Sequence, residues 1–187
     1  MARQKKYSEE EVVEKAMNLF WKNGFESTSM QMLEKEMGIN KFSIYSSFGS
    51  KNGLFIECLN SYKIELNRLM DKLRATENGA ADIKQYFYDF LEFSKGSDLG
   101  KGCLVTNTSN EIDIYTDEKI TEVLINSTND VKQLFASSLR KELEKDELII
   151  EQQADYLLLA MFGLSSASRL FTKTQLHNYI ENTFKNI

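Results

Sequence analysis

The stretch from Thr28 to Phe55, TSMQMLEKEMGINKFSIYSSFGSKNGLF, constrains the fold of this 187-residue chain more than any other. It contains two short helical patterns separated by a turn at Gly38, because glycine adopts the left-handed backbone that ends many helices. We expect Thr28 to cap the first helix with Gln31 in a T-x-x-Q capping box, and Asn40 to cap the second. These proportions predict a helix-turn-helix, whose second helix enters the major groove of DNA.

The second of these helices has the composition of a surface that reads DNA. Only Ile44 and Phe48 are expected to pack inward, and its other positions are polar or aromatic. Ser50 is expected to cap a third, longer helix. A bare helix-turn-helix pattern is a weak signal of function, so the identity of the residues within it has to decide.

The segment GINKFSIYSSFGSKNGLF resembles the recognition segment of TetR-type (TetR/AcrR) transcriptional regulators. The shared features are the glycine turn, the tyrosine within the recognition helix, the phenylalanine that follows and the F-G-S-K run. The resemblance extends from Ser8 to about Phe55, with weaker similarity in architecture beyond. Phe42 stands where most of the family has a small residue, and Ser46 and Ser47 replace the more usual histidines or charged residues. These departures leave the operator sequence open.

The resemblance implies operator DNA as a partner and assigns roles around the recognition helix. Lys51 and Tyr45 are expected to contact phosphates. Arg3 and Lys5 belong to a short basic arm that either reaches the DNA or is a solvated tail. Base edges are expected to be read by Lys41, Phe42, Ser43 and Ser46. The complete predicted set of DNA-binding residues is Arg3, Lys5, Thr28, Asn40, Lys41, Phe42, Ser43, Tyr45, Ser46 and Lys51.

The rest of the chain is predicted to be helical, which makes the fold all-α. The sequence contains no proline, and the alternation typical of strands is scarce. A long helix from Leu54 to about Leu73 is expected to link a DNA-binding domain, residues 1–53, to a regulatory and dimerisation domain, residues 54–187. A shift at the far end of such a shared helix would tilt the DNA-binding domain.

Residues 80–95 form a predicted helix that is rich in aromatic side chains, which are more often core than ligand contacts. Together with neighbouring helices it is expected to line a pocket for a small apolar effector. Asn107 or Glu111, on the polar face of a short helix after Gly102, could orient that ligand, although capping is the favoured explanation for both. The predicted ligand-binding residues are Tyr62, Leu66, Phe87, Phe90, Asn107, Leu124 and Met161.

Two C-terminal helices resemble the dimerisation pair of the same family, which packs as a four-helix bundle across a two-fold axis. A long helix is expected from Thr116 to about Lys145. The dimerisation pair follows it, with one helix from Glu151 to Phe171 and a last helix that includes Leu176 to Phe184. The helix from Glu151 to Phe171 is apolar around nearly its whole circumference, which favours burial against a second molecule. Thr172 and Gln175 form a further capping box, which opens the last helix. We therefore expect a homodimer that binds a near-palindromic operator.

The charge distribution is compatible with DNA binding, although the net charge is −5. Residues 1–53 carry eight Lys and Arg against seven Asp and Glu, whereas residues 54–187 carry fifteen against twenty-one. The acidic excess therefore belongs to the second part of the chain, where it favours solubility. Charge alone leaves DNA binding undecided, and the recognition motif decides it.

The sequence gives little support for an enzyme. It has one histidine, His177, and lacks a phosphate-binding glycine loop, a nucleophile elbow and a metal-ligand cluster. No catalytic residue, metal or cofactor is predicted. The first alternative is a DNA-binding helical protein that senses no small molecule, and a helical enzyme with carboxylates from distant helices is less favoured.

Cysteine usage and hydropathy predict a cytoplasmic protein without contact to a membrane. Cys58 and Cys103 lack metal-type spacing and fit a reducing compartment. Cys103 is either a sensing thiol or, as we favour, an inert buried one. The first residues lack an apolar core of signal-peptide length, and the longest apolar run is too short to cross a bilayer.

Overall fold

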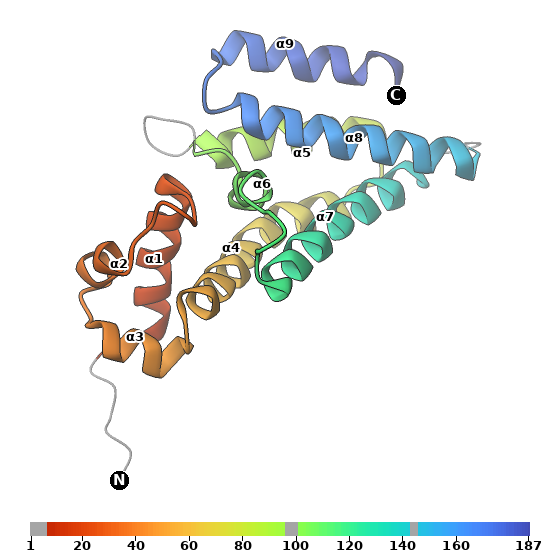
Figure 1. Ribbon diagram of the computed structural model, residues 1–187. Coiled ribbons are helices and arrows are strands. Elements are labelled where there is room, and N and C mark those ends of the chain that lie inside the picture. Colours follow the sequence, from red (N-terminus) through yellow and green to blue (C-terminus); the bar gives the residue numbers. More distant parts are fainter. Residues whose placement is uncertain (1–6, 96–100, 143–145) are drawn as a thin grey trace.

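The computed structural model describes residues 7–95, 101–142 and 146–187, and its described residues form helices without strands. We call α1–α3 the head and α4–α9 the body (Figure 1). The helices are α1 Glu9–Asn23, α2 Met30–Met37, α3 Lys41–Phe48, α4 Lys51–Arg74, α5 Ala80–Lys95, α6 Leu104–Ser109, α7 Glu118–Leu139, α8 Glu147–Ala167 and α9 Lys173–Thr183, followed by a short 3₁₀ turn, Phe184–Asn186. The all-α prediction is confirmed.

The turn between α2 and α3 forms as the sequence predicts. Gly38 ends α2 with a left-handed backbone, φ +70°, and its N–H donates to the carbonyl of Glu34. The side chain of Asn40 caps α3 by accepting the N–H of Ser43 at 2.9 Å. The two helices are therefore held in a fixed relation by backbone chemistry that their own residues supply.

Apolar side chains from all three head helices meet the first turns of α4. Leu33 and Ile44 are fully buried, and the ring of Phe20 packs edge-on against Phe55 with centroids 4.8 Å apart. Phe25, in the turn after α1, lies 4.6 Å from the same ring. The core of the head therefore includes the start of α4.

The helix α4 leads from the head into the body (Figure 1). It begins at Lys51, capped by Ser50, so the predicted domain boundary at residue 53 falls within its first turn. Its later buried residues, from Tyr62 to Leu73, pack among the body helices. At the opposite end of the molecule from α3, α8 and α9 lie side by side.

Two predicted helix starts in the body are wrong. The side chain of Asp117, not that of Thr116, caps α7, and Thr116 instead bonds to Asp113 in the preceding turn. The helix α8 begins at Glu147, capped by Asp146, which is four residues before the predicted start. The capping box at the start of α9 is confirmed in full. No helix among the described residues is long and apolar enough to span a membrane.

Replacement of Phe87 by alanine should test whether this ring is core. Phe87 is fully buried and packs on Phe135 and Phe184, with centroids 5.9 and 5.0 Å away. Chemical denaturation of Phe87→Ala should show a loss of about 3–5 kcal/mol in the free energy of unfolding. Phe42→Ala, at an exposed site, should change it by less than about 0.5 kcal/mol. Equal stabilities for the two variants would contradict the core assignment.

Candidate nucleic-acid interface

The outer face of α3 carries several exposed side chains, two of them aromatic. Phe42 is 81% exposed, an unusual position for a large apolar ring. Tyr45 is also exposed, and the ammonium of Lys41 lies 5.6 Å from its ring. Ser46 is exposed beside them, whereas Ser43 is half-buried. Most of the predicted base-reading residues thus share one solvent-facing surface, which we call the α3 face.

Contacts at both ends hold α3 in place under this surface. The hydroxyl of Tyr7 lies 2.8 Å from Oγ of Ser47, which joins the start of α1 to the inner side of α3. At the other end, a carboxylate oxygen of Glu34 accepts the N–H of Lys41. Neither pairing was predicted, because each joins side chains or backbone groups of separate segments that only the tertiary fold brings together. Asn40 belongs to this support as the cap of α3, and its predicted contact with DNA stays a prediction.

The prediction for Thr28 is wrong. The residue is fully buried, and its hydroxyl donates to the carbonyl of Gly24 at 2.6 Å, so it cannot reach DNA. Ser29, one position later, caps α2 by accepting the N–H of Met32 at 3.2 Å. The two adjacent hydroxyl residues divide two roles, because one side chain points into the α1–α2 turn and the other points to the helix terminus.

Lys51, at the start of α4, already makes contacts within the protein. Its ammonium lies 4.3 Å from the ring centroid of Phe25, a cation–π distance. Partial burial lowers the pKa of Lys51, and the nearby carboxylates of Glu26 and Glu111 oppose that shift. The predicted phosphate contact would therefore replace an existing set of contacts. Arg3 and Lys5 lie outside the described residues.

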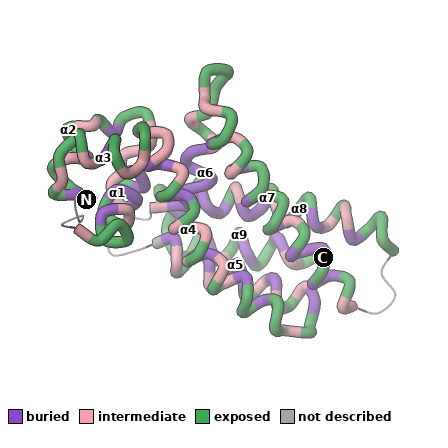
Figure 2. The backbone as a smooth tube through the Cα atoms, turned by 90° about the horizontal axis from the view of Figure 1, so that it is seen from below, coloured by how far each residue is buried: buried purple, intermediate pink, exposed green. Residues whose placement is uncertain are grey.

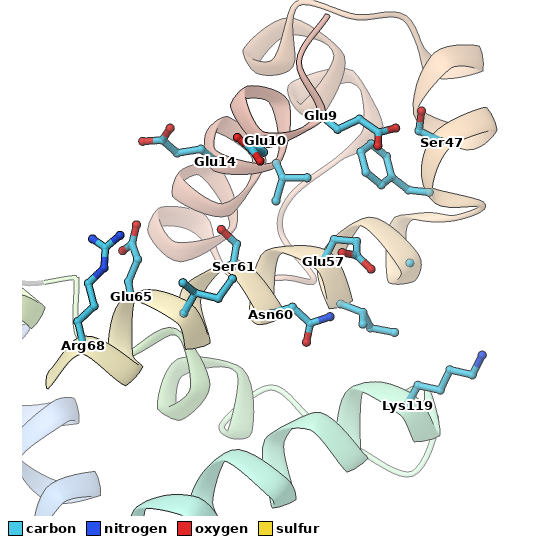
Figure 3. Close-up of a pocket in the computed structure, with 15 residues that line it drawn as sticks. Glu9, Glu10, Glu14, Ser47, Glu57, Asn60, Ser61, Glu65, Arg68 and Lys119 are labelled. Carbon is cyan, nitrogen blue, oxygen red and sulfur yellow. The ribbon is translucent and has the colours of Figure 1, made fainter. Parts of the chain in front are cut away.

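A half-open groove of about 890 Å³ lies beside the head, between α1, α3, α4 and the start of α7 (Figure 3). Its walls carry the carboxylates of Glu9, Glu10, Glu14, Glu57 and Glu65 against the cations of Arg68 and Lys119. This acidic excess repels phosphate. The groove is therefore not assigned to the candidate DNA-binding surface around α3.

The body contains a small, mostly apolar cavity of about 30 Å³ among α4, α5, α6, α7 and α8. Three of the predicted ligand-binding residues line it, namely Leu66, Phe90 and Met161. The polar residues Thr106 and Ser127 also line it. The volume suits about one water molecule and lies well below the 300–1,000 Å³ of typical ligand pockets.

The other four predicted ligand-binding residues do not line this cavity. Phe87 packs in the core against Phe135 and Phe184, and Leu124 is buried in α7. Tyr62 donates its hydroxyl to Sγ of Cys103 at 3.2 Å, and burial raises the pKa of this phenol well above its ordinary value. Asn107 donates to the carbonyl of Lys101 at 2.8 Å and so shapes the turn before α6. Helical spacing identified buried faces but not which of them border free space.

Residues 101–111, which we call the bridge segment, connect the head to the body. Figure 2 shows buried residues along its helix, α6, between the head and α7. Nε1 of Trp21 donates to the carbonyl of Gly102 at 3.1 Å. A carboxylate oxygen of Glu111 accepts the N–H of Glu26 at 3.0 Å. Neither bond was predicted from the sequence, because each spans more than eighty residues.

The comparisons with known proteins agree with this architecture. The sequence model of the bacterial regulatory proteins of the tetR family matches residues 12–58. An uncharacterised HTH-type transcriptional regulator of Bacillus subtilis, YezE, is 26% identical over 149 residues, which are 79% of this chain and 76% of the relative. The HTH-type transcriptional repressor ComR of Escherichia coli is 30% identical over 56% of this chain and 51% of its own length.

Solved structures share the fold over nearly the whole chain. A cysteine mutant of the TetR family transcriptional regulator CifR, complexed with a 26-bp double-strand operator DNA, superposes with a TM-score of 0.88. It is 23% identical, and the match covers 98% of this chain and 99% of that one. The reduced form of NemR from Escherichia coli matches with a TM-score of 0.80 at 22% identity, over 95% of each chain.

Proposed function

Because residues 12–58 place this chain in the tetR family of bacterial regulatory proteins, which are DNA-binding transcriptional regulators, we propose that it is a dimeric repressor. A small apolar molecule would release this repressor from its operator. The observation that carries this proposal is the α3 face, on which Phe42 and Tyr45 project from a helix that is held at both ends. A large ring left in solvent on a rigid helix suits a partner surface rather than a core.

The α3 face has the chemistry for reading bases in the major groove. The ring of Phe42 matches the methyl group of thymine, and the ammonium of Lys41 matches the O6 and N7 acceptors of guanine. Tyr45 and Lys51 flank these side chains, so we assign them to phosphates. Phosphate contacts fix the register of a protein on DNA but carry no direct sequence information.

Selection of bound DNA from a random pool tests the proposal directly. We expect enrichment of a near-palindrome, and Phe42→Ala should change the preferred bases, foremost at a thymine. Lys51→Ala should instead weaken binding to all sequences alike and reduce the salt slope by about one unit. An unchanged base preference in Phe42→Ala would remove this ring from base reading, and a pool without any enrichment would refute DNA reading itself.

The C-terminal helices carry the apolar surface that we assign to the dimer. Leu159 on α8 is 71% exposed and Leu170 after it is 84% exposed, with Tyr156, Phe171 and Tyr179 exposed nearby. Several large apolar side chains on two adjacent helices favour a protein partner, and a second copy would bury the same patch twice across a two-fold axis. Such a dimer would place two α3 helices roughly 34–36 Å apart, or a multiple of that distance.

Two residues of α8, Leu159 and Gly163, offer sites for a variant that disrupts the dimer, and Leu159→Asp is the cleaner test. A Cβ at Gly163 would lie 2.9 Å from the hydroxyl of Tyr179 in the same chain, so that variant would also disturb the α8–α9 packing. We expect Leu159→Asp to be monomeric in sedimentation at micromolar concentration and to bind the operator at least about tenfold more weakly, since one head then acts alone. Ile64→Asp, at an exposed site on α4, is the control and should stay dimeric. A dimeric Leu159→Asp protein would refute this interface.

The effector proposal assigns the cavity bounded by Leu66, Phe90 and Met161 to a small, largely apolar molecule. Its present volume requires that half-buried side chains such as Leu158 and Phe162 move to admit a ligand. Because α6 contributes to the wall, an occupied cavity would displace a helix whose flanking residues Gly102 and Glu111 are bonded to the head. The alternative is a regulator that senses no small molecule, as a nearly filled core would favour.

Reciprocal coupling separates these two alternatives. Compounds that raise the melting temperature in a screen of small apolar molecules would be titrated by calorimetry with and without the selected operator. A true effector should bind about 5–150-fold more weakly in the presence of operator, and linkage requires the operator to be weakened by the same factor. Equal affinities would identify bound cargo, and a screen without hits would favour the alternative without sensing.

A further inference from the structure

Glu111 lies where the bridge segment meets the turn between α1 and α2. One carboxylate oxygen accepts the N–H of Glu26 at 3.0 Å. The other lies against Gly24, where an added Cβ would approach it to 2.5 Å, and Gly24 has a φ of +86°. Only glycine combines this backbone conformation with so close an approach. The turn and the carboxylate therefore fit one another closely.

The same turn is tied to the helices that carry the α3 face. The carbonyl of Gly24 accepts the hydroxyl of Thr28, which directly precedes the cap of α2. Phe25 packs on Phe55 of α4 and receives the ammonium of Lys51 on its ring. A change in the position of Glu111 would thus act on a rigid unit that includes α2 and the start of α4.

The bridge segment is in turn anchored in the body. The N–H of Cys103 donates to Oγ of Ser165 on α8 at 3.0 Å, and Tyr62 of α4 bonds to the sulfur of Cys103. The head is also held by packing, since Trp21 of α1 contacts Tyr62 of α4 and Phe93 of α5 with ring centroids 5.0 and 5.9 Å away. The bonds from Gly102 and Glu111, on the head side of this anchor, add to this packing and oppose rocking of the head against the body.

We propose that Glu111 is a positioning residue for operator reading, which fixes the orientation of the head on the body and thereby the half-site spacing that the dimer accepts. This inference rests on the proposed function. One base pair inserted between the half-sites increases their separation by about 3.4 Å and rotates one half-site relative to the other by roughly 35° about the DNA axis. A dimer with rigidly held heads should bind the altered operator more weakly, whereas a dimer whose heads can rock should bind both operators with similar affinity.

The test compares operators whose half-sites are separated by the selected spacing or by one base pair more or fewer. We expect Glu111→Ala to lower the discrimination between these operators about fivefold or more, the lower end of typical coupling between sites. Glu111→Gln keeps an acceptor for the N–H of Glu26 and should stay within about twofold of the wild type. Glu118→Ala removes the same charge at an exposed position of α7, and its discrimination between spacings should also stay within about twofold of the wild type.

Hydrogen exchange in the free protein tests the contact without DNA. The amide of Glu26 should exchange about tenfold faster or more in Glu111→Ala, with wild-type exchange in Glu111→Gln. Wild-type spacing discrimination in Glu111→Ala would overturn the proposal, as would an equal loss of affinity for all three spacings, which indicates a structural role only. A similar loss of spacing discrimination in Glu118→Ala would also overturn the proposal, because it would indicate a general effect of charge. A wild type that selects no operator refutes the proposed function, and this inference falls with it.

Discussion

The burial of one face of α4 by two groups of helices is the constraint on which the structure depends. Phe55, near its start, completes the aromatic core of the head, and Met70, near its end, is buried among the body helices. Tyr62 lies between them and packs edge-on against Trp21 with centroids 5.0 Å apart. The head and the body therefore share one continuous core, and α4 cannot turn about its axis without disrupting both.

Local chemistry explains which parts of this fold the sequence predicts. A helix end depends on a few neighbouring residues, so Gly38, Asn40 and the capping box at Thr172 were predicted correctly. The same reasoning failed where two adjacent residues had equal capping chemistry. Thr28 and Ser29 differ only in which one the tertiary structure buries, and that choice depends on the carbonyl of Gly24.

Contacts between distant segments set the limit for the candidate sites. Periodicity predicted that Phe87 and Phe90 are buried. Only the tertiary structure places Phe135 of α7 and Phe184, after α9, against Phe87, and leaves a cavity beside Phe90. Glu111 was considered for its position on a polar helix face. Its partner is the backbone N–H of Glu26, a group that every residue except proline has, so the residue type at position 26 gives no sign of this bond.

The bridge segment also bears on how such regulators can be recombined. A head cut out at the start of α4 would leave Gly102 and Glu111 behind in the body, together with the surfaces that receive Trp21 and Gly24. A chimera that grafts residues 1–50 onto a foreign body would thus pair each half with a mismatched neighbour. The exchangeable module is discontinuous in sequence, and a working graft would carry residues 101–111 along with the head.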